Sequence, residues 1–293
     1  MNAALFSILI DPETGQPLQI EPSGEALVNS SSKSRYPIIS NVPVMLSPKS
    51  IPAETFDYAA HYQADAEAFD YFAVHEQGDA RYENRRLREV IVAQVPPGVQ
   101  NILDVGCGSA WVAGHFCPQG IAVYSMDIST VNPIKALELH PFEHHFGIAA
   151  DVFALPFPEG TFDCIIASEI IEHVPDPKGF LANLLTVLRP GGVLIATTPY
   201  NEKITYTLCI HCNQPTPLNA HLHSFTAGKL RSLLPVSPAP KAKTITFCNK
   251  VLIRLQTHVL LQYLPFTIWR LLDRITNKLW YKPNRLLLKV IKQ

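Results

Sequence analysis

Between residues 101 and 198 the sequence contains five short apolar segments, each bounded by residues that favour turns. Apolar runs of this length, separated by stretches long enough for helices, predict a parallel β-sheet covered on both faces. A helix is expected from about Pro177 to Arg189, between the fourth and fifth runs. The expected strands are Asn101–Val105, Ile121–Met126, His145–Ala150, Phe162–Ala167 and Val193–Thr198.

The first expected strand runs into a glycine-rich turn, Gly106-Cys107-Gly108. Glycine allows a tight turn and a close approach to a ligand above the strand ends, where open α/β sheets bind cofactors. The dinucleotide fingerprint G-x-G-x-x-G would need glycine at position 111, where this chain has tryptophan. A nicotinamide or flavin dehydrogenase is therefore disfavoured.

Acidic residues end the second and third expected strands. Asp127 follows the glycine turn by about 20 residues, where a carboxylate can accept hydrogen bonds from both hydroxyls of a ribose. Asp151 ends the third strand, and we expect it to reach an adenine amino group while Val152 packs on the adenine ring. Each acid alone is equally compatible with helix capping, but their order along the chain favours a nucleoside cofactor.

The runs LDVGCGSA, AADVFALPFPEGTFDCIIASEIIEHVPDP and LLTVLRPGGVLIATTP, with the acid at 127, resemble successive motifs of class I S-adenosylmethionine-dependent methyltransferases of the type 11 group. The resemblance covers roughly residues 98–234 and departs at Ala110, where glycine is usual. It implies a Rossmann-like α/β sheet of seven strands with the last antiparallel, and Lys243–Cys248 and Arg285–Ile291 fit strands six and seven.

The resemblance also implies S-adenosylmethionine as the cofactor, with Asp104, Gly106 and Gly108 around its methionine part. A mainly helical segment precedes the sheet, and in related enzymes such helices close over the cofactor. Tyr58, Tyr62 and Phe69 would then belong to this lid, or else to an ordinary core. The residues expected to bind the cofactor are Asp104, Gly106, Cys107, Gly108, Asp127, Ile128, Asp151, Val152, Ser168 and Tyr62.

Glu169, Glu172 and His173 follow the fourth expected strand. In a helical turn their spacing would place both carboxylates and the imidazole on one face, where they could hold a divalent metal. The pattern resembles metal-binding segments of ubiquinone-pathway O-methyltransferases and of small-RNA 2′-O-methyltransferases, both of which act on vicinal hydroxyls. In the RNA group a further histidine precedes a phenylalanine, as His223 precedes Phe225 here. The alternative is that no metal binds and Glu172-His173 closes a helix.

A second metal scheme combines Cys209-x-x-Cys212 with His221-x-His223 as a zinc set. The two schemes compete for His223. Without a metal, we expect His221 or His223 to line the acceptor pocket. The candidate catalytic residues are Glu169, His173 and His221, and the candidate metal ligands are Glu169, Glu172, His173 and His223.

The chain is expected to divide into a small β-rich unit at 1–46, a linker at 47–55 and the methyltransferase domain at 56–293. The first unit resembles the zinc-ribbon-like domain that activates tRNA and protein methyltransferases, most clearly in YPIISNVPVML. Ile10–Glu13 and Asn29–Lys33 occupy the places of the zinc cysteines, so this resemblance implies no zinc. The strands expected here are Phe6–Ile10, Leu18–Ile20, Tyr36–Ile39 and Val42–Leu46.

Residues 251–280 are expected to insert two helices, split by Pro265, between strands six and seven. Residues 251–293 carry eight Lys and Arg against one acid, Asp273, although the whole chain has a net charge of −1. The insertion could cover the acceptor pocket or contact a membrane surface. In the second helix an apolar face of Ile268, Leu272, Ile275 and Leu279 opposes Arg270, Arg274 and Lys278.

These features predict an S-adenosylmethionine-dependent methyltransferase that methylates oxygen on a small or lipid-linked molecule. The alternatives are a metal-assisted RNA 2′-O-methyltransferase, which the lack of a basic face in the catalytic core disfavours, and a module that binds the cofactor without catalysis. No basic signal-peptide start precedes Asp11, and the six cysteines are scattered. A cytoplasmic protein is therefore expected, with peripheral membrane contact through 251–293 as a further hypothesis.

Overall fold

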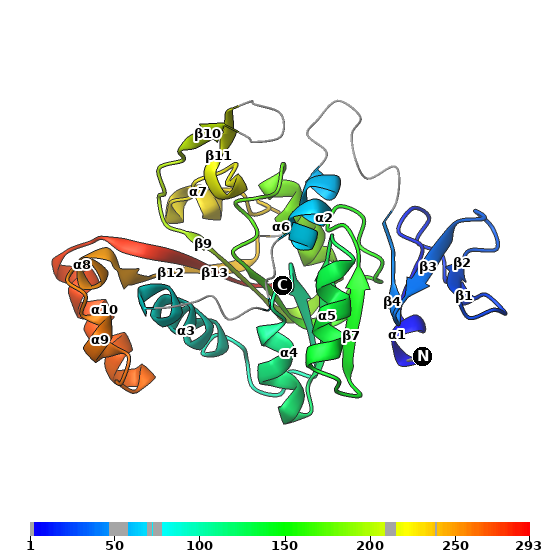
Figure 1. Ribbon diagram of the computed structural model, residues 1–293, viewed down its shortest axis with the longest axis horizontal. Helices are drawn as coiled ribbons and strands as arrows, with labels where there is room; N and C mark the ends of the chain where they lie inside the picture. The colour runs from blue at the N-terminus through cyan, green and yellow to red at the C-terminus, as the bar shows by residue number, and fades with distance from the viewer. Residues whose placement is uncertain (1–2, 47–57, 69–71, 73–77, 209–214, 238) are drawn as a thin grey trace.

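A computed structural model describes residues 3–46, 58–68, 72, 78–208, 215–237 and 239–293 (Figure 1). Its centre is a seven-stranded sheet of order β12-β13-β9-β8-β5-β6-β7. Strand β13 runs antiparallel to both neighbours, while the strands from β9 to β7 pair in parallel. The predicted Rossmann-like α/β fold is therefore confirmed. The strands are β5 Asn101–Val105, β6 Ala122–Asp127, β7 His145–Ala149, β8 Phe162–Ser168, β9 Leu188–Pro199, β12 Lys241–Asn249 and β13 Pro283–Ile291.

Alternation along the strands divides the apolar core between the two faces of the sheet. In β8, Ile165 faces the core that contains helix α6, whereas Ile166 faces the core that contains α3 and α4. Asp176 caps α6, because its side chain accepts a hydrogen bond from the Lys178 amide and Pro177 follows as the first helical residue. The helices around the sheet are α2 Tyr58–Ala68, α3 Gly78–Val92, α4 Trp111–Phe116, α5 Val131–Leu139, α6 Pro177–Val187 and α7 Ala227–Ser232.

Shorter elements complete the region after β9. Strands β10, Tyr206–Leu208, and β11, Pro215–Pro217, form a two-stranded antiparallel sheet. A 3₁₀ turn, Leu218–Ala220, follows them, and another, Cys117–Gln119, ends α4. No helix in the described part of the chain is long and apolar enough to cross a membrane.

The N-terminal unit forms its own four-stranded antiparallel sheet, at the right in Figure 1. The strand predicted at Phe6–Ile10 is wrong, because the chain begins with a short helix, α1. Leu5 and Phe6 of this helix and Leu9 after the following turn all enter the core, whereas a strand would turn alternate residues outward. The elements are α1 Ala3–Phe6, β1 Gln19–Ile20, β2 Ala26–Val28, β3 Arg35–Ile39 and β4 Val42–Pro43.

The N-terminal unit packs against β7, the last strand of the central sheet. Val44 pairs in parallel with Ala149, and the Met45 amide donates to the Ala149 carbonyl at 2.7 Å. The Ile10 amide donates to the Pro156 carbonyl at 3.0 Å. The small unit therefore covers an edge that would otherwise present unpaired backbone groups.

Asp11 lies at the centre of a hydrogen-bonded cluster between the loops where the resembled domain carries its zinc cysteines. Its carboxylate accepts hydrogen bonds from Asn29 Nδ2 at 2.7 Å, Ser32 Oγ at 2.9 Å and the Tyr36 hydroxyl at 3.0 Å, and from the Glu13 amide at 2.9 Å. Burial raises the pKa of Asp11, but these donors outweigh that effect and hold the pKa at about 2. A charged hydrogen-bonding cluster thus connects the two loops.

The predicted helical insertion lies between β12 and β13, at the left in Figure 1. Its first predicted helix is divided into α8, Lys250–Arg254, and α9, His258–Leu261, because Gln256 adopts a left-handed φ of 52°. The second is α10, Phe266–Leu279, which begins after Pro265 as predicted.

Candidate cofactor and active site

A pocket of about 340 Å³ opens at the carboxyl ends of β5, β6, β7 and β8. This is where open α/β sheets bind ligands, and the volume is in the range of small-molecule sites. The structure brings every residue predicted to bind the cofactor into its lining. These are Asp104, Gly106, Cys107, Gly108, Asp127, Ile128, Asp151, Val152, Ser168 and Tyr62.

The glycine turn forms the floor of the pocket. Gly106 has a φ of 67°, and a Cβ atom at this position would collide with the Ile170 side chain, so both backbone conformation and space require glycine. Ala110 adopts a φ of 53°, which explains why glycine is usual at this position in the resembled family. Ile170 therefore connects the glycine turn to the Glu169–His173 segment.

Asp104 lies below the glycine turn and is almost completely buried. One of its carboxylate oxygens has no hydrogen-bond partner. Burial raises the pKa of Asp104 well above its ordinary value, and the nearby charge of Asp127 raises it further. A cationic ligand group would satisfy this oxygen and favour the charged form.

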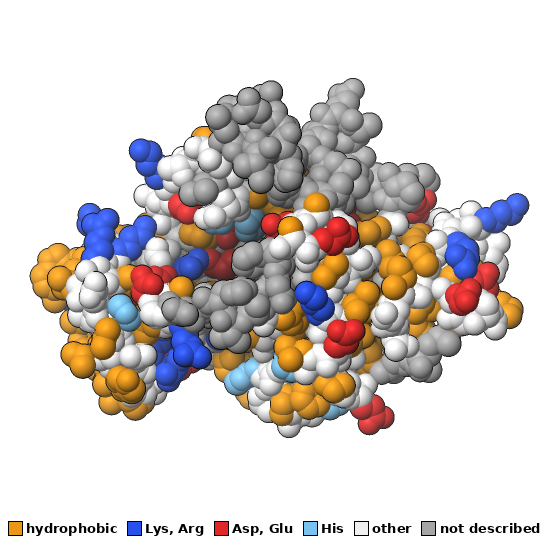
Figure 2. Space-filling view, in the orientation of Figure 1, with side chains coloured by type: hydrophobic (Ala, Val, Ile, Leu, Met, Phe, Trp, Pro, Cys, Tyr) orange, Lys and Arg blue, Asp and Glu red, His pale blue; other side chains and the backbone are white. Residues whose placement is uncertain are grey.

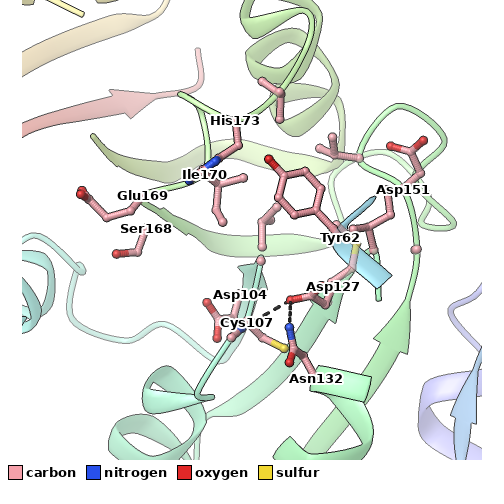
Figure 3. A pocket seen from close by; sticks show the side chains of 18 of the residues that line it. Tyr62, Asp104, Cys107, Asp127, Asn132, Asp151, Ser168, Glu169, Ile170 and His173 are labelled. Atoms are coloured by element: carbon pink, nitrogen blue, oxygen red, sulfur yellow. Dashed lines mark hydrogen bonds between the residues drawn. The ribbon is translucent and has the colours of Figure 1, made fainter. Parts of the chain in front are cut away.

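Asp127 lies at the end of β6, with its carboxylate already held in place (Figure 3). It accepts hydrogen bonds from the Ser129 amide at 3.0 Å, Asn132 Nδ2 at 3.1 Å and the Gly108 amide at 3.5 Å. Burial raises its pKa, and these three donors oppose that rise. Oδ2 accepts two of these bonds and Oδ1 accepts one, so Oδ1 keeps a lone pair that can accept a ribose hydroxyl without the loss of a present partner.

The adenine side of the predicted site is formed after β7. Asp151 accepts a hydrogen bond from the Phe153 amide at 2.9 Å, which orients its carboxylate, and Val152 is buried beside it. Cys107 also lines the pocket, and burial raises the pKa of its thiol well above the ordinary value. Cys107 therefore acts as an apolar wall and not as a thiolate nucleophile.

Helix α2 brings Tyr62 over the pocket. The Tyr62 and His173 rings are nearly perpendicular, with centroids 5.9 Å apart (Figure 3). Gln63 Oε1 accepts a hydrogen bond from the Thr130 amide at 2.9 Å, which fastens α2 to the start of α5. Burial raises the pKa of Tyr62, so it stays a neutral phenol. The Tyr58 side chain and all of Phe69, also predicted in this lid, lie outside the described residues.

Glu169 lines the same pocket as His173, but its carboxylate is directed away from the rest of the motif. Its φ of 59° is left-handed, so the predicted helical turn does not include it. Its carboxylate forms an ion pair with Arg285 of β13 and points away from His173 in Figure 3. The expectation that Glu169 and Glu172 share one face with His173 is therefore wrong, because the bend after β8 turns Glu169 toward the C-terminal strand.

Glu172, His173 and His221 form the cluster that the structure does assemble. One ligand atom from each lies within 4.8 Å of the others, and the two imidazole centroids are 4.8 Å apart. Glu172 is 1% exposed, neither of its oxygens has a partner with hydrogen-bonding geometry, and burial raises its pKa well above the ordinary value. His221 Nδ1 lies 2.5 Å from Glu202 Oε2, an arrangement that orients its other ring nitrogen.

His223, predicted as a metal ligand, lies outside this cluster. Its Nε2 lies 3.0 Å from the Val174 carbonyl, whereas its backbone amide and that of Leu222 donate to the Glu172 carbonyl. These amides hold the His221–His223 segment against the Glu172 turn. Cys209 and Cys212 lie outside the described residues, so the zinc scheme stays a prediction.

Sequence reasoning missed several residues that shape the site. Asn132 follows Asp127 by five positions, a spacing that could have indicated a helix-borne donor returning to the strand end. Arg285 and Glu202 offered no such signal, because they meet Glu169 and His221 only through the fold. Asp65, Trp111 and Ile170 also line the pocket.

Comparison with known proteins agrees with this geometry. The profile of the methyltransferase domain family matches residues 75–235, more than half of the chain. A solved S-adenosylmethionine-dependent methyltransferase from Mesorhizobium loti has the same fold, with a TM-score of 0.52, 18% identity, and coverage of 72% of this chain and 100% of that one. The chain therefore belongs to the methyltransferase domain family and has the fold of an S-adenosylmethionine-dependent methyltransferase.

Curated relatives match mainly over the core of this domain. A ubiquinone biosynthesis O-methyltransferase from Parvibaculum lavamentivorans is 38% identical over 99 residues, which cover 33% of this chain and 39% of the relative. One from Ralstonia nicotianae is 28% identical over 168 residues, covering 53% and 69%. The chain spans about half the length of the curated relatives it matches.

Proposed function

We propose that this protein transfers the methyl group of S-adenosylmethionine to a hydroxyl oxygen of a small-molecule acceptor. The observation that carries the proposal is the position of His173, which lines the cofactor pocket and also belongs to the cluster with Glu172 and His221. Proton-transfer groups thus adjoin the place where the donor methyl would lie. A hydroxyl needs such groups, because it is a poor nucleophile until its proton is removed.

In the proposed reaction the methyl carbon–sulfur bond breaks as the new carbon–oxygen bond forms. The acceptor hydroxyl gives its proton to the His173 imidazole, and S-adenosylhomocysteine leaves. Burial raises the pKa of Glu172 well above its ordinary value, so we assign the proton transfer to His173, whose ligand atom lies within 4.8 Å of those of Glu172 and His221. Tyr62 excludes water from the opposite side of the His173 ring.

The cluster also fits a divalent metal. One carboxylate and two imidazoles form a donor set that transition metals accept, and the Glu172 oxygens have no competing hydrogen bond. Glu202 would orient His221 toward the metal. A metal at this position would lower the pKa of a bound hydroxyl.

The relatives named ubiquinone biosynthesis O-methyltransferase support oxygen as the acceptor atom. Residues of the insertion that stay exposed although they are apolar support an acceptor carried by a lipid. Oxygen as the acceptor atom and a lipid as the carrier of the acceptor are therefore parts of the proposal that the assays below and vesicle binding test.

The test has two steps, cofactor binding and then turnover. Calorimetric titration with S-adenosylmethionine is expected to show a single site. Labelled methyl transfer is then measured to 3,4-dihydroxybenzoate and to its 3-amino-4-hydroxy counterpart, with and without Mg²⁺, Mn²⁺ or Zn²⁺. Labelled catechol-oxygen product supports the proposal, whereas transfer to nitrogen alone overturns it. Binding without any transfer across an acceptor panel would favour a non-catalytic module.

Two histidine variants provide a matched comparison. His173→Ala is expected to reduce methyl transfer at least 100-fold, as general-base removal does. His223→Ala removes a ring that lies outside the cluster and is expected to keep most of the activity. Equal losses in the two variants would contradict the assignment of His173.

A further inference from the structure

The insertion is fixed to the body of the protein by polar contacts on the inner side of α10. Asp273 is fully buried, and its carboxylate accepts hydrogen bonds from the Asn249 amide at 3.0 Å and from Asn277 Nδ2 at 3.2 Å. Trp269 is also buried, and its Nε1 lies 2.5 Å from the Tyr82 hydroxyl of α3. Asp273 and Asn277 of α10 therefore face inward, where each makes hydrogen bonds.

Further contacts attach the loop before α10 to α3. Arg86 is fully buried and donates to the Leu261 carbonyl at 2.6 Å and the Leu264 carbonyl at 2.9 Å. Its guanidinium stacks on the Trp269 ring at 4.9 Å. Buried hydrogen bonds, together with the packing of Trp269 in the core, therefore fix the orientation of the insertion.

The outer side of the insertion is apolar. Figure 2 shows hydrophobic side chains gathered over its left end, with Lys and Arg beside them. We call this group the insertion face, and it consists of Leu260, Tyr263, Leu271, Ile275, Leu279 and Trp280. Their side chains are 47% to 80% exposed, which is unusual for a contiguous group of large apolar residues.

Basic side chains lie beside the insertion face. Arg274 and Lys278 are exposed and occupy one stripe of α10, four residues apart, next to the stripe of Leu271 and Ile275. Residues 251–293 carry eight Lys and Arg and one acid, and that acid, Asp273, is buried. The outward charge of this region is therefore positive.

We propose that the insertion face docks on the surface of an anionic lipid bilayer. The apolar side chains would enter the boundary between headgroups and acyl chains, while Arg274 and Lys278 meet anionic headgroups. Tyr263 and Trp280 suit the headgroup level, where amphipathic rings concentrate. Helix α10 is about 21 Å long at 1.5 Å per residue, shorter than a hydrocarbon core of about 30 Å, so it lies along the surface.

Charge complementarity favours a bilayer over a second copy of the chain, since a self-complementary contact would bring the basic stripes of two molecules together. The proposal deepens the proposed function, because an enzyme held at a bilayer can reach a lipid-linked acceptor. Vesicle binding itself requires neither cofactor nor acceptor. A lack of vesicle binding would therefore not count against methyl transfer, and each of the two proposals can fail without the other.

The test is flotation of the full-length protein with vesicles of phosphatidylglycerol and phosphatidylcholine, compared with vesicles of phosphatidylcholine alone. We expect binding to the anionic vesicles that weakens as salt is added. The double variant Leu271→Ser, Ile275→Ser should lower the partition coefficient at least tenfold. Arg274→Gln and Lys278→Gln should each lower it about fivefold.

Leu139→Ser provides the matched control, because Leu139 is also a half-exposed leucine but lies on α5, outside the insertion. It should bind vesicles as the unaltered protein does. Each variant should keep its thermal stabilisation by S-adenosylmethionine, which verifies folding. Equal binding by the Leu271/Ile275 variant, or no binding to anionic vesicles, would overturn the proposal. Light scattering that shows a dimer lost in that variant would assign the face to a second copy instead.

Discussion

Two buried carboxylates, Asp11 in the N-terminal sheet and Glu172 beside the cofactor pocket, have opposite environments. Both are at most 1% exposed. Asp11 accepts hydrogen bonds from two side chains of the 29–33 loop and from Tyr36 of β3, and it has a pKa of about 2. Neither oxygen of Glu172 has a partner with hydrogen-bonding geometry, and burial raises its pKa although the nearby Thr198 hydroxyl opposes that rise. Burial alone therefore does not identify the role of an acid.

The difference in hydrogen bonding distinguishes an acid that stabilises the fold from an acid that is available to a ligand. A buried charge with several donors contributes to stability, and its loss leaves those donors unpaired. A buried carboxyl without donors costs folding free energy, which is tolerated where a reaction or a ligand requires it. Asp11 belongs to the first kind and Glu172 to the second, and each of the following experiments tests that contrast.

The largest expected effect is on stability. Asp11→Ala leaves Asn29, Ser32 and Tyr36 without their acceptor, and we expect a loss of about 3–4 kcal/mol in the free energy of unfolding. Chemical denaturation and hydrogen exchange in β2 and β3 would measure it. Glu25→Ala, at an exposed position of the same unit, should change stability by less than about 0.5 kcal/mol. A similar small change for Asp11→Ala would remove the structural role.

Glu172→Gln is expected to act on the reaction and not on folding. The amide keeps the shape of the neutral carboxyl but loses its capacity to bind a metal as an anion. We expect methyl transfer to fall about 100-fold, or roughly 2.7 kcal/mol in the barrier, with the dissociation constant for S-adenosylmethionine unchanged. Because Glu172 lies in one cluster with His173 and His221, the pH profile of turnover and its dependence on added Mn²⁺ should change as well.

Glu169→Gln provides the control within the same motif. This acid is paired with Arg285, so its substitution should leave the metal dependence of turnover unaltered. A loss of metal dependence in Glu169→Gln, but not in Glu172→Gln, would reverse the assignment of the two acids.

The two acids should also give opposite dependences of stability on pH. The folded pKa of Asp11 is lowered, so its contribution is present above pH 4 and is lost as pH falls toward 2; we expect about 1–2 kcal/mol. The folded pKa of Glu172 is raised, so in metal-free protein stability falls as pH rises above the ordinary glutamate pKa. The free energy of unfolding, measured as a function of pH, should lose the acidic decline in Asp11→Asn and the decline at higher pH in Glu172→Gln.

The smallest expected effect concerns a single donor. Ser32→Ala removes one hydrogen bond to Asp11 but leaves Asn29 and Tyr36 in place, so we expect a loss of about 1 kcal/mol. Thermal unfolding would detect it. A loss as large as that of Asp11→Ala would mean that the cluster fails as a unit and not bond by bond.

The positions of the acids at the carboxyl ends of the strands could be predicted from the sequence, because the residues that indicate them are neighbours in the chain. Asp127 and Asp151 each follow an apolar run and Asp104 lies one residue before the end of another, and parallel strands bring their carboxyl ends to one edge of the sheet. The pocket lining predicted from them therefore matches the structure. Their individual contacts with the cofactor stay predictions.

Residues that meet only through tertiary structure could not be predicted in this way. Spacing placed Glu169 with Glu172, but the left-handed bend at Glu169 directs its side chain to Arg285, 116 positions away. The sequence also showed that α10 is amphipathic without showing which side faces inward. Buried contacts of Asp273 with Asn249 and Asn277 decide that orientation.

The backbone pairing between Val44 and Ala149 has a practical consequence for handling the protein. A chain shortened to the methyltransferase domain would lose the Met45 amide that donates to the Ala149 carbonyl, and β7 would become a bare outer strand. Such strands recruit other copies into intermolecular sheets. Truncated expression products should therefore self-associate and precipitate, and the first 46 residues act in effect as a built-in solubility tag for the domain that follows them.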